Sequence, residues 1–260
     1  MAGIDNFCWC DPLESKKTPD GRYKLAQLVR SNQALYDYTT LYGVPCISGK
    51  DSMKNDYIIE GVKISIPPTF LFSVLGKIGD VRKVVTMDAK SAGDLVYILG
   101  ETRCELGGSE WFAMHDAVGN GVPVVRGEEA KALYEALSSA VASGLIASCH
   151  DCSEGGLGVA LAETAFSGGL GMEIDLARVP CLDVERDDYL FFSESQSRFV
   201  VTVHAEDKDA FEAALEGNCF ALIGRVTGEE ILLVHGMGGG EILRERNEDL
   251  KLAWQKPLAL

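Results

Sequence analysis

The sequence has no long hydrophobic run and no excess of positive charge. No apolar stretch approaches the roughly 20 residues that a membrane-spanning helix needs, and the start, MAGIDNFCWC, lacks the basic and apolar segments of a secretion signal. Lys and Arg number 24 against 39 Asp and Glu, a net charge of −15. Because contact with nucleic acid depends on clustered cations, we expect a cytoplasmic protein that binds neither nucleic acid nor membrane.

The eight cysteines lack the regular spacing of a disulfide framework. They lie singly or in close pairs within apolar or mixed segments, which favours reduced, buried thiols. Two pairs, Cys8 with Cys10 and Cys149 with Cys152, raise the question of a zinc site. Since such a site needs a full set of tetrahedral ligands at finger-like spacing, which is not present, we predict none.

The polar stretch DAKSAGD, just after Met87, interrupts the pattern of the chain, and we place a domain boundary at 86/87. Residues 1–86 hold one expected helix, from Lys24 to Tyr42 with Gly43 in the C′ position, and too few strands to cover both faces of a sheet. Residues 87–260 alternate strand and helix signals, which predicts an α/β (α+β) fold with helices against one face of a sheet. The segment Ile64–Ile78 is expected to contain a longer strand that is entered through Pro67-Pro68. The other expected strands are Val44–Ser48, Leu95–Leu99, Leu145–Cys149, Met172–Val179, Phe199–His204, Phe220–Val226 and, last, Ile231–His235; the further helices are Glu128–Ala142, Gly156–Phe166 and Asp207–Leu215.

The first candidate site is GVPCISGKDSMKND at 43–56, where a short apolar strand leads into a polar turn. Gly49 would let the backbone approach a ligand closely, and Lys50 would supply a charge suited to phosphate. Ser52 can donate to a phosphate oxygen, and Asp51 or Asp56 could face a metal ion. An ordinary polar hairpin loop explains the same residues equally well.

The second candidate is HDCSEGGLG at 150–158, where a strand end meets a glycine-rich helix start. Asp151 would hold Mg²⁺ through oxygen contact, and Ser153 would meet a phosphate. The alternative is that Ser153 is the helix N-cap and Asp151 a turn acceptor. We expect His150 to be a hydrogen-bonded structural residue rather than an acid–base catalyst, and we assign no role to the other histidines.

The third candidate is FFSESQSR at 191–198. In an extended chain Glu194, Gln196 and Arg198 lie on one side and the two intervening serines on the other. This predicts either a ligand-facing strip or a hydrogen-bonded corner. In ELGGSEW at 105–111, Ser109 is expected to cap a helix.

Together these segments resemble the phosphoribosylformylglycinamidine synthase family of purine biosynthesis. The matching pieces, which cover nearly all of the chain in family order, are DNFCWCDP, LAQLVRSNQALYDYTTLYGVPCISGKDSMKND, IPPTFLFSVLGKI, GDLVYILGETRCELGGSEW, HDCSEGGLGVALAETAF and FSESQSRFVVTV. The family belongs to a wider group that includes aminoimidazole ribonucleotide synthetase, whose members combine an N-terminal α/β domain, paired into a central barrel, with a C-terminal α/β domain. The resemblance implies a partial, N-terminally truncated first domain at 1–86 and a complete second domain at 87–260.

The family is an ATP-dependent ligase and amidotransferase that converts formylglycinamide ribonucleotide, ATP and glutamine into formylglycinamidine ribonucleotide, ADP, phosphate and glutamate. The resemblance therefore implies ATP or ADP and Mg²⁺ as cofactors, and formylglycinamide ribonucleotide as a ligand. It also implies two protein partners, the missing first half of the synthase, which carries the catalytic histidine, and a glutaminase domain or subunit. No catalytic residue is expected here, and the chain alone should be inactive. Uncovered N-terminal strands would favour a homodimer.

Carried over by motif, the resemblance places Asp5 and Gly49 near ATP and Ser52 near the substrate. It makes Asp151 a metal ligand and Ser153 a nucleotide contact, in an auxiliary nucleotide site of longer members. The chain departs from the pattern Gly-Asn-Val-Ser of shorter members, where Asn binds Mg²⁺, because it has Gly-Lys-Asp-Ser here. Either Lys50 replaces the charge of the cation, or Asp51 binds the metal. A non-catalytic nucleotide-binding or assembly module is the alternative function, and a free-standing kinase of the same group a weaker one.

Overall fold

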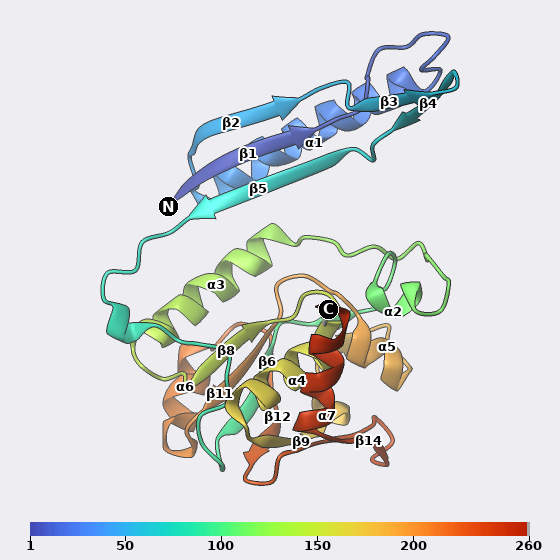
Figure 1. The fold of residues 1–260 in the computed structure, drawn as a ribbon. Coiled ribbons are helices and arrows are strands. Elements are labelled where there is room, and N and C mark those ends of the chain that lie inside the picture. The colour runs from blue at the N-terminus through green and yellow to red at the C-terminus, as the bar shows by residue number, and fades with distance from the viewer. Residues whose placement is uncertain (259–260) are drawn as a thin grey trace. The chain divides into compact units, whose positions relative to one another are not determined.

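The computed structural model describes residues 1–258 and consists of two compact units, Met1–Gly79 and Asp80–Leu260 (Figure 1). The second unit begins a few residues before the predicted boundary. Its first segment is tied down by two hydrogen bonds, from Lys83 Nζ to the Ala142 carbonyl (3.2 Å) and from the Cys149 N–H to the Thr86 carbonyl (3.1 Å). No helix of the described residues combines the length and the apolar character that a bilayer crossing requires.

The first unit is a three-stranded sheet with one long helix, α1 (Gly21–Tyr42), on one face. The side chains of Phe7 and Phe70 face this helix and pack against each other in a tilted arrangement, with ring centroids 4.6 Å apart. As predicted, α1 ends at Gly43, whose φ of 65° only glycine adopts readily. The strands lie in the order β2 (Cys46–Ser52), β1 (Ala2–Cys8) and β5 (Thr69–Leu75), with β1 parallel to β2 and antiparallel to β5.

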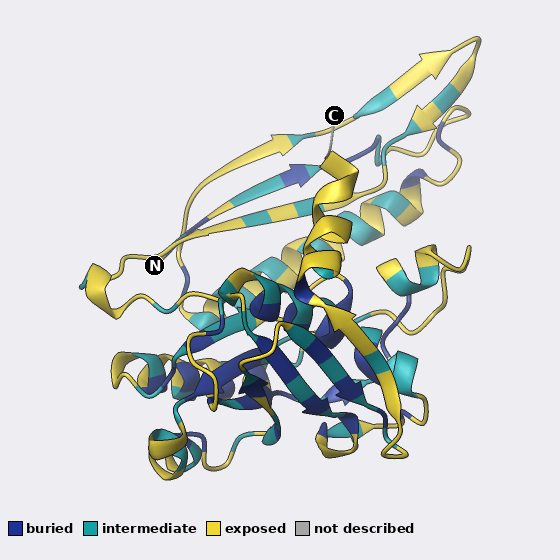
Figure 2. Cartoon of the chain, turned by 60° about the horizontal axis from the view of Figure 1, so that its bottom comes forward, coloured by how far each residue is buried: buried dark blue, intermediate teal, exposed yellow. Residues whose placement is uncertain are grey.

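The opposite face of this sheet carries apolar side chains that the first unit leaves exposed. Alternation along paired strands places Ile4 and Leu71 on this face, and the two residues are 44% and 58% exposed. Figure 2 shows exposed stretches along the strands of the first unit. A hairpin of β3 (Asp56–Ile59) and β4 (Val62–Ser65) also carries exposed apolar side chains. The predicted strand within Ile64–Ile78, entered through Pro67-Pro68, is present as β5, and the two prolines separate it from β4.

The second unit is a seven-stranded sheet with helices on both faces, so the prediction of helices against one face is wrong. Along the strand β6 (Leu95–Leu99), Val96 and Ile98 enter one core, while Tyr97 and Leu99 enter the other. Both alternating sets are apolar, and the pattern of a half-exposed strand is therefore lost. The strands lie in the order β14 (Glu241–Arg246), β13 (Ile231–His235), β9 (Gly171–Asp175), β12 (Phe220–Thr227), β6, β11 (Phe199–Val203) and β8 (Ser148–Asp151). β9 is parallel to β13, and the pairing is antiparallel elsewhere.

The first of the two cores is covered by α4 (Gly156–Gly168), α5 (Asp187–Phe192) and α7 (Asn247–Gln255), and the second by α3 (Gly127–Ala142) and α6 (Lys208–Ala214). A short helix, α2 (Glu110–Ala113), and a two-stranded parallel pair, β7 (Thr102–Arg103) with β10 (Cys181–Leu182), complete the unit.

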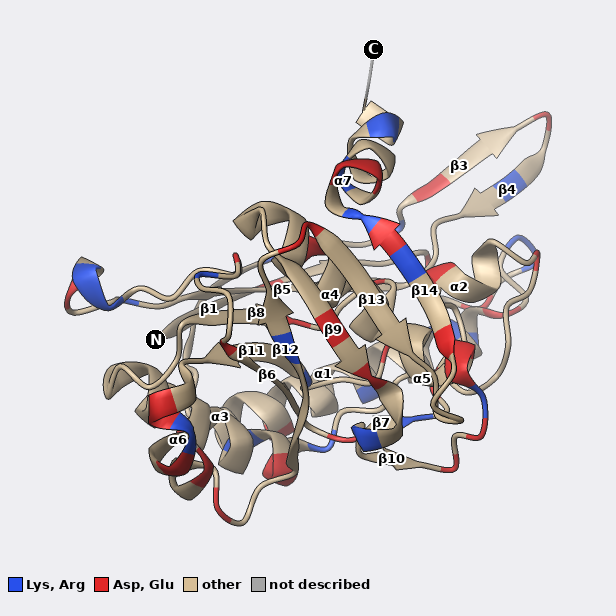
Figure 3. Ribbon diagram, turned by 90° about the horizontal axis from the view of Figure 1, so that it is seen from below, with Lys and Arg blue, Asp and Glu red and all other residues tan. Residues whose placement is uncertain are grey.

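The two elements at the C-terminal end, β14 and α7, were not predicted, and Ile231–His235 is therefore not the last strand. The N-terminal strand β1 was not predicted either. β14 has the sequence EILRER, and Figure 3 shows charged residues of both signs along it. Its apolar residues are too few to give a strand signal. α7 is held by Asn247, a buried residue whose Nδ2 donates to the Leu170 carbonyl (3.0 Å) and more weakly to that of Ala165 (3.4 Å).

Candidate functional site

The polar residues after the short apolar segment of the first unit continue a strand, which makes the predicted turn wrong. Gly49 pairs with Asp5, and Ser52 pairs with Cys8. A Cβ atom at Gly49 would lie 2.5 Å from Asp5 Oδ1, so the close approach of this carboxylate requires glycine. Pairing with β1 thus explains both the strand and the glycine.

Successive side chains of a strand point to opposite faces. Asp5 and Gly49 lie on the same face as Phe7, toward α1, whereas Ser52 lies on the open face. Lys50 shares the open face and its Nζ donates to Ser52 Oγ. The structure therefore brings Asp5 together with Gly49, and separates both from Ser52.

In the second unit, the motifs HDCSEGGLG, FFSESQSR and ELGGSEW meet around Glu194. Its Oε1 accepts hydrogen bonds from the N–H groups of Gly155 (2.9 Å) and Glu110 (3.0 Å), at the starts of α4 and α2. Gly155 and Gly156 have positive φ angles of 77° and 61°. A Cβ atom on Gly156 would collide with the Ser193 carbonyl, so this glycine is needed for the close contact of the segments.

Arg198 lies beneath this corner with 1% of its surface exposed. Its guanidinium donates to the Ser195 carbonyl (3.0 Å), to Thr102 Oγ1 (2.8 Å) and to the Ser193 carbonyl, all of which are neutral acceptors. Burial lowers the pKa of Arg198 from its ordinary value. The predicted hydrogen-bonded corner is present, and it holds a buried cation.

A cavity of about 280 Å³ opens at this corner, and Asp151, Ser153, Glu194 and Arg198 all line it. Asp151 ends β8 and its side chain is 62% exposed. Ser153 Oγ donates to Asp151 Oδ2. The N-cap of α4 is Gly155 without a side-chain bond, so the alternative of Ser153 as N-cap is wrong. The two residues predicted to bind nucleotide and metal therefore share one cavity.

His150 is hydrogen-bonded as predicted, through Nε2 to Glu163 Oε2 at 2.6 Å. Its other ring nitrogen, Nδ1, lies 3.5 Å from Asp151 Oδ1. Glu163 lies on α4, and sequence reasoning did not single it out. Its spacing of 13 residues from His150 carries no local signal.

The chemistry of the cavity fits a hard cation bound together with phosphate. Within residues 1–258, no three His, Cys, Asp or Glu side chains gather so that they could hold a metal ion. Asp151 and Glu154 both line the cavity with exposed carboxylates, and one or two carboxylates suffice for Mg²⁺ that keeps water and phosphate ligands. Burial raises the pKa of Cys149 to about 12 and that of Cys152 to about 11, which disfavours thiolate ligands.

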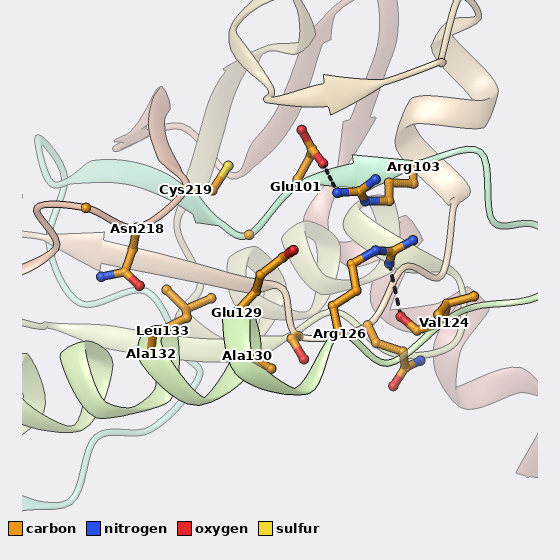
Figure 4. A pocket seen from close by; sticks show the side chains of 14 residues that line it. Glu101, Arg103, Val124, Arg126, Glu129, Ala130, Ala132, Leu133, Asn218 and Cys219 are labelled. Carbon is orange, nitrogen blue, oxygen red and sulfur yellow. Dashed lines mark hydrogen bonds and ion pairs between the residues drawn. The ribbon is translucent and has the colours of Figure 1, made fainter. Parts of the chain in front are cut away.

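A second cavity, of about 480 Å³, adjoins the first and shares Gln196 and Ser197 with it (Figure 4). Its wall includes Arg103, paired with Glu101 at 2.5 Å, and Arg126, whose guanidinium contacts the buried Glu105 at 2.8 Å. These pairs balance the two guanidinium charges, so the wall has no clear preference for an anion. Sequence reasoning missed this cavity because its lining comes from segments far apart in the chain.

Residues 91–236 match the family described as AIR synthase related protein, C-terminal domain. The chain belongs to this family. It is 35% identical over 234 residues to the phosphoribosylformylglycinamidine synthase subunit PurL of Methanocaldococcus jannaschii, which corresponds to 89% of this chain and 31% of that relative. The chain thus spans less than a third of that relative's length. The family resemblance inferred from the motifs is confirmed.

Solved structures agree on the fold. Thermotoga maritima PurL complexed with FGAR matches 96% of this chain and 39% of its own, with a TM-score of 0.70 and 19% identity. Escherichia coli HypE matches 94% of this chain and 73% of its own, with a TM-score of 0.69 and 14% identity. The predicted α/β fold of the AIR synthase type is confirmed.

Proposed function

We propose that this chain is a portion of a phosphoribosylformylglycinamidine synthase, the ATP-dependent C–N ligase that forms formylglycinamidine ribonucleotide in cytoplasmic purine biosynthesis. The identity of 35% to a PurL subunit supports this most strongly, because the match covers 89% of the chain. Among the structural neighbours are T. maritima PurL complexes with ATP, with ADP and with FGAR. Residues 1–86 would belong to an N-terminal domain of that synthase, and residues 87–260 to a C-terminal domain.

In the cavity of the second unit, different residues would contact the metal ion and the phosphates of a bound nucleotide. Asp151 would bind the Mg²⁺ that accompanies the phosphates, and Ser153 would donate to a phosphate oxygen. The buried charge of Arg198 favours an anion above it. The carboxylate of Glu194 is already bonded to two N–H groups, which reduces its repulsion of phosphate. When bound, Mg²⁺ neutralises charge on the phosphates.

In the first unit, Asp5 and Gly49 would contact nucleotide and Ser52 would contact formylglycinamide ribonucleotide. Because Ser52 lies on the other face of the sheet, the two ligands would approach from different sides. Asp51 pairs with Phe7 and so shares the face of Asp5, whereas Lys50 is bonded to Ser52. This placement favours Asp51 as the residue that replaces the metal-binding Asn.

The nucleotide site is tested by titrating the 260-residue chain with Mg-ADP in a calorimeter. We expect saturable binding by the wild-type chain, and its loss in Asp151→Asn, because the amide cannot provide the charged metal ligand. Binding that Asp151→Asn leaves unchanged would contradict the site. Saturable binding by a chain that no partner can activate would favour the alternative, a non-catalytic nucleotide-binding module, which the location of the cavity within one unit supports.

The missing partners are tested by activity. With formylglycinamide ribonucleotide, ATP, Mg²⁺ and ammonia, the chain alone should give no product, because no catalytic residue is assigned to it. Addition of the first half of a synthase, and of the glutaminase when glutamine replaces ammonia, should be required. Substantial turnover by the chain alone would contradict this division of the active site.

A further inference from the structure

A chain of side-chain contacts runs from the C-terminal helix to the cavity of the second unit. It begins on α7, where Trp254 Nε1 donates to Glu163 Oε1 at 2.8 Å. Glu163 Oε2 lies 2.6 Å from His150 Nε2, and His150 Nδ1 lies 3.5 Å from Asp151 Oδ1. Nothing in the proposed nucleotide contacts accounts for this arrangement.

The contacts fix the imidazole ring of His150. An ionised carboxylate only accepts hydrogen bonds, so Nε2 of His150 carries the hydrogen that Glu163 receives. Both oxygens of Glu163 are engaged, one by His150 and one by Trp254, which holds the carboxylate plane. The side chains of His150 and Glu163 are only 16% and 20% exposed, and the ring is therefore held by packing as well.

Asp151 differs from these neighbours because its side chain is 62% exposed. An exposed aspartate samples several rotamers, and a ligand that needs one of them loses binding free energy because this rotamer must be ordered. Here one oxygen accepts from Ser153 Oγ, and the other lies 3.5 Å from Nδ1 of His150. Because the ring hydrogen is on Nε2, this second contact is steric: the ring occupies space into which the carboxylate would otherwise rotate. The two neighbours restrict the carboxylate at the mouth of the cavity.

We propose that His150 is a positioning residue, which holds the carboxylate of Asp151 ready for a metal–nucleotide ligand, and that Glu163 and Trp254 hold His150 for this task. The inference rests on the proposed function, since it needs Asp151 as the metal ligand. Residues behind a metal ligand commonly contribute about 10- to 100-fold to metal affinity. Helix α7 thereby becomes a support of the site.

The test measures two dissociation constants for each variant by calorimetry, that of Mg-ADP and that of ADP with EDTA. Positioning of a metal ligand affects only the first. In His150→Ala we expect the dissociation constant of Mg-ADP to rise about tenfold, with that of metal-free ADP unchanged. Glu163→Gln should act in the same direction, and Trp254→Phe should act least, because it is the contact farthest from Asp151. Titration with Mn²⁺ alone, followed by electron paramagnetic resonance, should show the same order.

Glu185→Gln is the matched control for Glu163→Gln, since it makes the same change at an exposed position. It should leave both constants unchanged, and thermal melting should show that every variant is folded. If both constants rise together in His150→Ala, the effect is general and the positioning role is wrong. If Asp151→Asn weakens Mg-ADP binding but His150→Ala and Glu163→Gln do not, the positioning role fails and the nucleotide site stands. If Asp151→Asn has no effect, both fail.

Discussion

Single side chains in the second unit show how burial decides what a polar group contributes. Asp94 is 4% exposed at its side chain, and its Oδ1 lies 2.7 Å from Nδ1 of His204, a histidine to which the sequence assigned no role. The other oxygen of Asp94 has no partner among the described residues. The hydrogen bond to Asp94, more than any other interaction, raises the pKa of His204. The pair therefore links folding to pH.

A raised pKa in the folded state means that protonated His204 stabilises the fold. This contribution is complete below the unfolded pKa of about 6.5 and is lost as pH rises through the higher folded value. We expect the free energy of unfolding of the wild type to fall over this window relative to His204→Gln. Because the His204 side chain is 42% exposed, solvent screening limits the difference to under about 1 kcal/mol. Urea melts from pH 6 to 8.5 measure it, and parallel curves for the two proteins would refute the linkage.

The buried guanidinium of Arg198 should contribute more to the free energy of unfolding than the pair of His204 and Asp94. Arg198→Met leaves the carbonyls of Ser193 and Ser195 and the hydroxyl of Thr102 without their donor, and a buried unsatisfied polar group costs about 1–3 kcal/mol. We expect a loss of at least about 3 kcal/mol in urea melts. Arg178→Met is the control, because Arg178 forms an exposed pair with Asp175 that is worth under about 1 kcal/mol. Equal losses in both variants would contradict this account.

At the scale of elements, the junction of β8 and α4 depends on the absence of a side chain. Gly156 combines a φ of 61° with a backbone carbonyl in the place where a Cβ atom would stand. Gly144, which follows α3, has a φ of 75° and open space around the same position. The two glycines therefore separate the cost of conformation from the cost of a collision.

We predict that Gly144→Ala costs about 1 kcal/mol, the conformational penalty alone. Gly156→Ala should cost clearly more, because the first turn of α4 must also move away from Ser193. It should also weaken Mg-ADP binding, since Asp151 and Ser153 precede this turn. Urea melts and calorimetry of both variants measure the difference. Equal stability of the two variants would show that α4 shifts without cost.

At the scale of the whole molecule, the two units differ in how they bury apolar surface. The sheet of the second unit has a core on each face, whereas the sheet of the first unit leaves Ile4 and Leu71 exposed. Exposed apolar sheet surface favours association with another chain. The missing half of a synthase and a second copy of this chain are the two occupants that we propose.

We expect the isolated chain to form homodimers through the N-terminal strands, and Leu71→Lys to shift it toward monomer, because the substitution places a charge on the open face. Val118→Lys, at an exposed position of the second unit, should leave the assembly unchanged. Sedimentation velocity over a range of concentrations measures the shift. A wild-type chain that stays monomeric at every concentration would contradict the homodimer.

The sequence predicts those elements whose signal is local. Leu95–Leu99 and Ile231–His235 were predicted with their observed bounds, because each is an apolar run between polar residues. β2 extends beyond its prediction because pairing with β1 holds the polar residues through Ser52 in the sheet. β14 lacks an apolar pattern and depends on its partner β13.

The same limit applies to the candidate site. Asp151 and Ser153 were identified because they lie in one short motif. The contact of Glu163 with His150, and that of Glu194 with two helix starts, join segments that the sequence does not place together. A local pattern indicates which residues carry chemistry, whereas tertiary contacts decide what holds them.

The two hydrogen bonds that Glu194 accepts from the amides of Gly155 and Glu110 have one more consequence. A phosphate that binds here would meet amides that already donate to the Glu194 carboxylate. The phosphate would either displace that carboxylate and accept both hydrogen bonds itself, or bind beside it. Occupancy of this corner is then an exchange between two anions, and a ligand gains only by what it offers beyond the resident side chain.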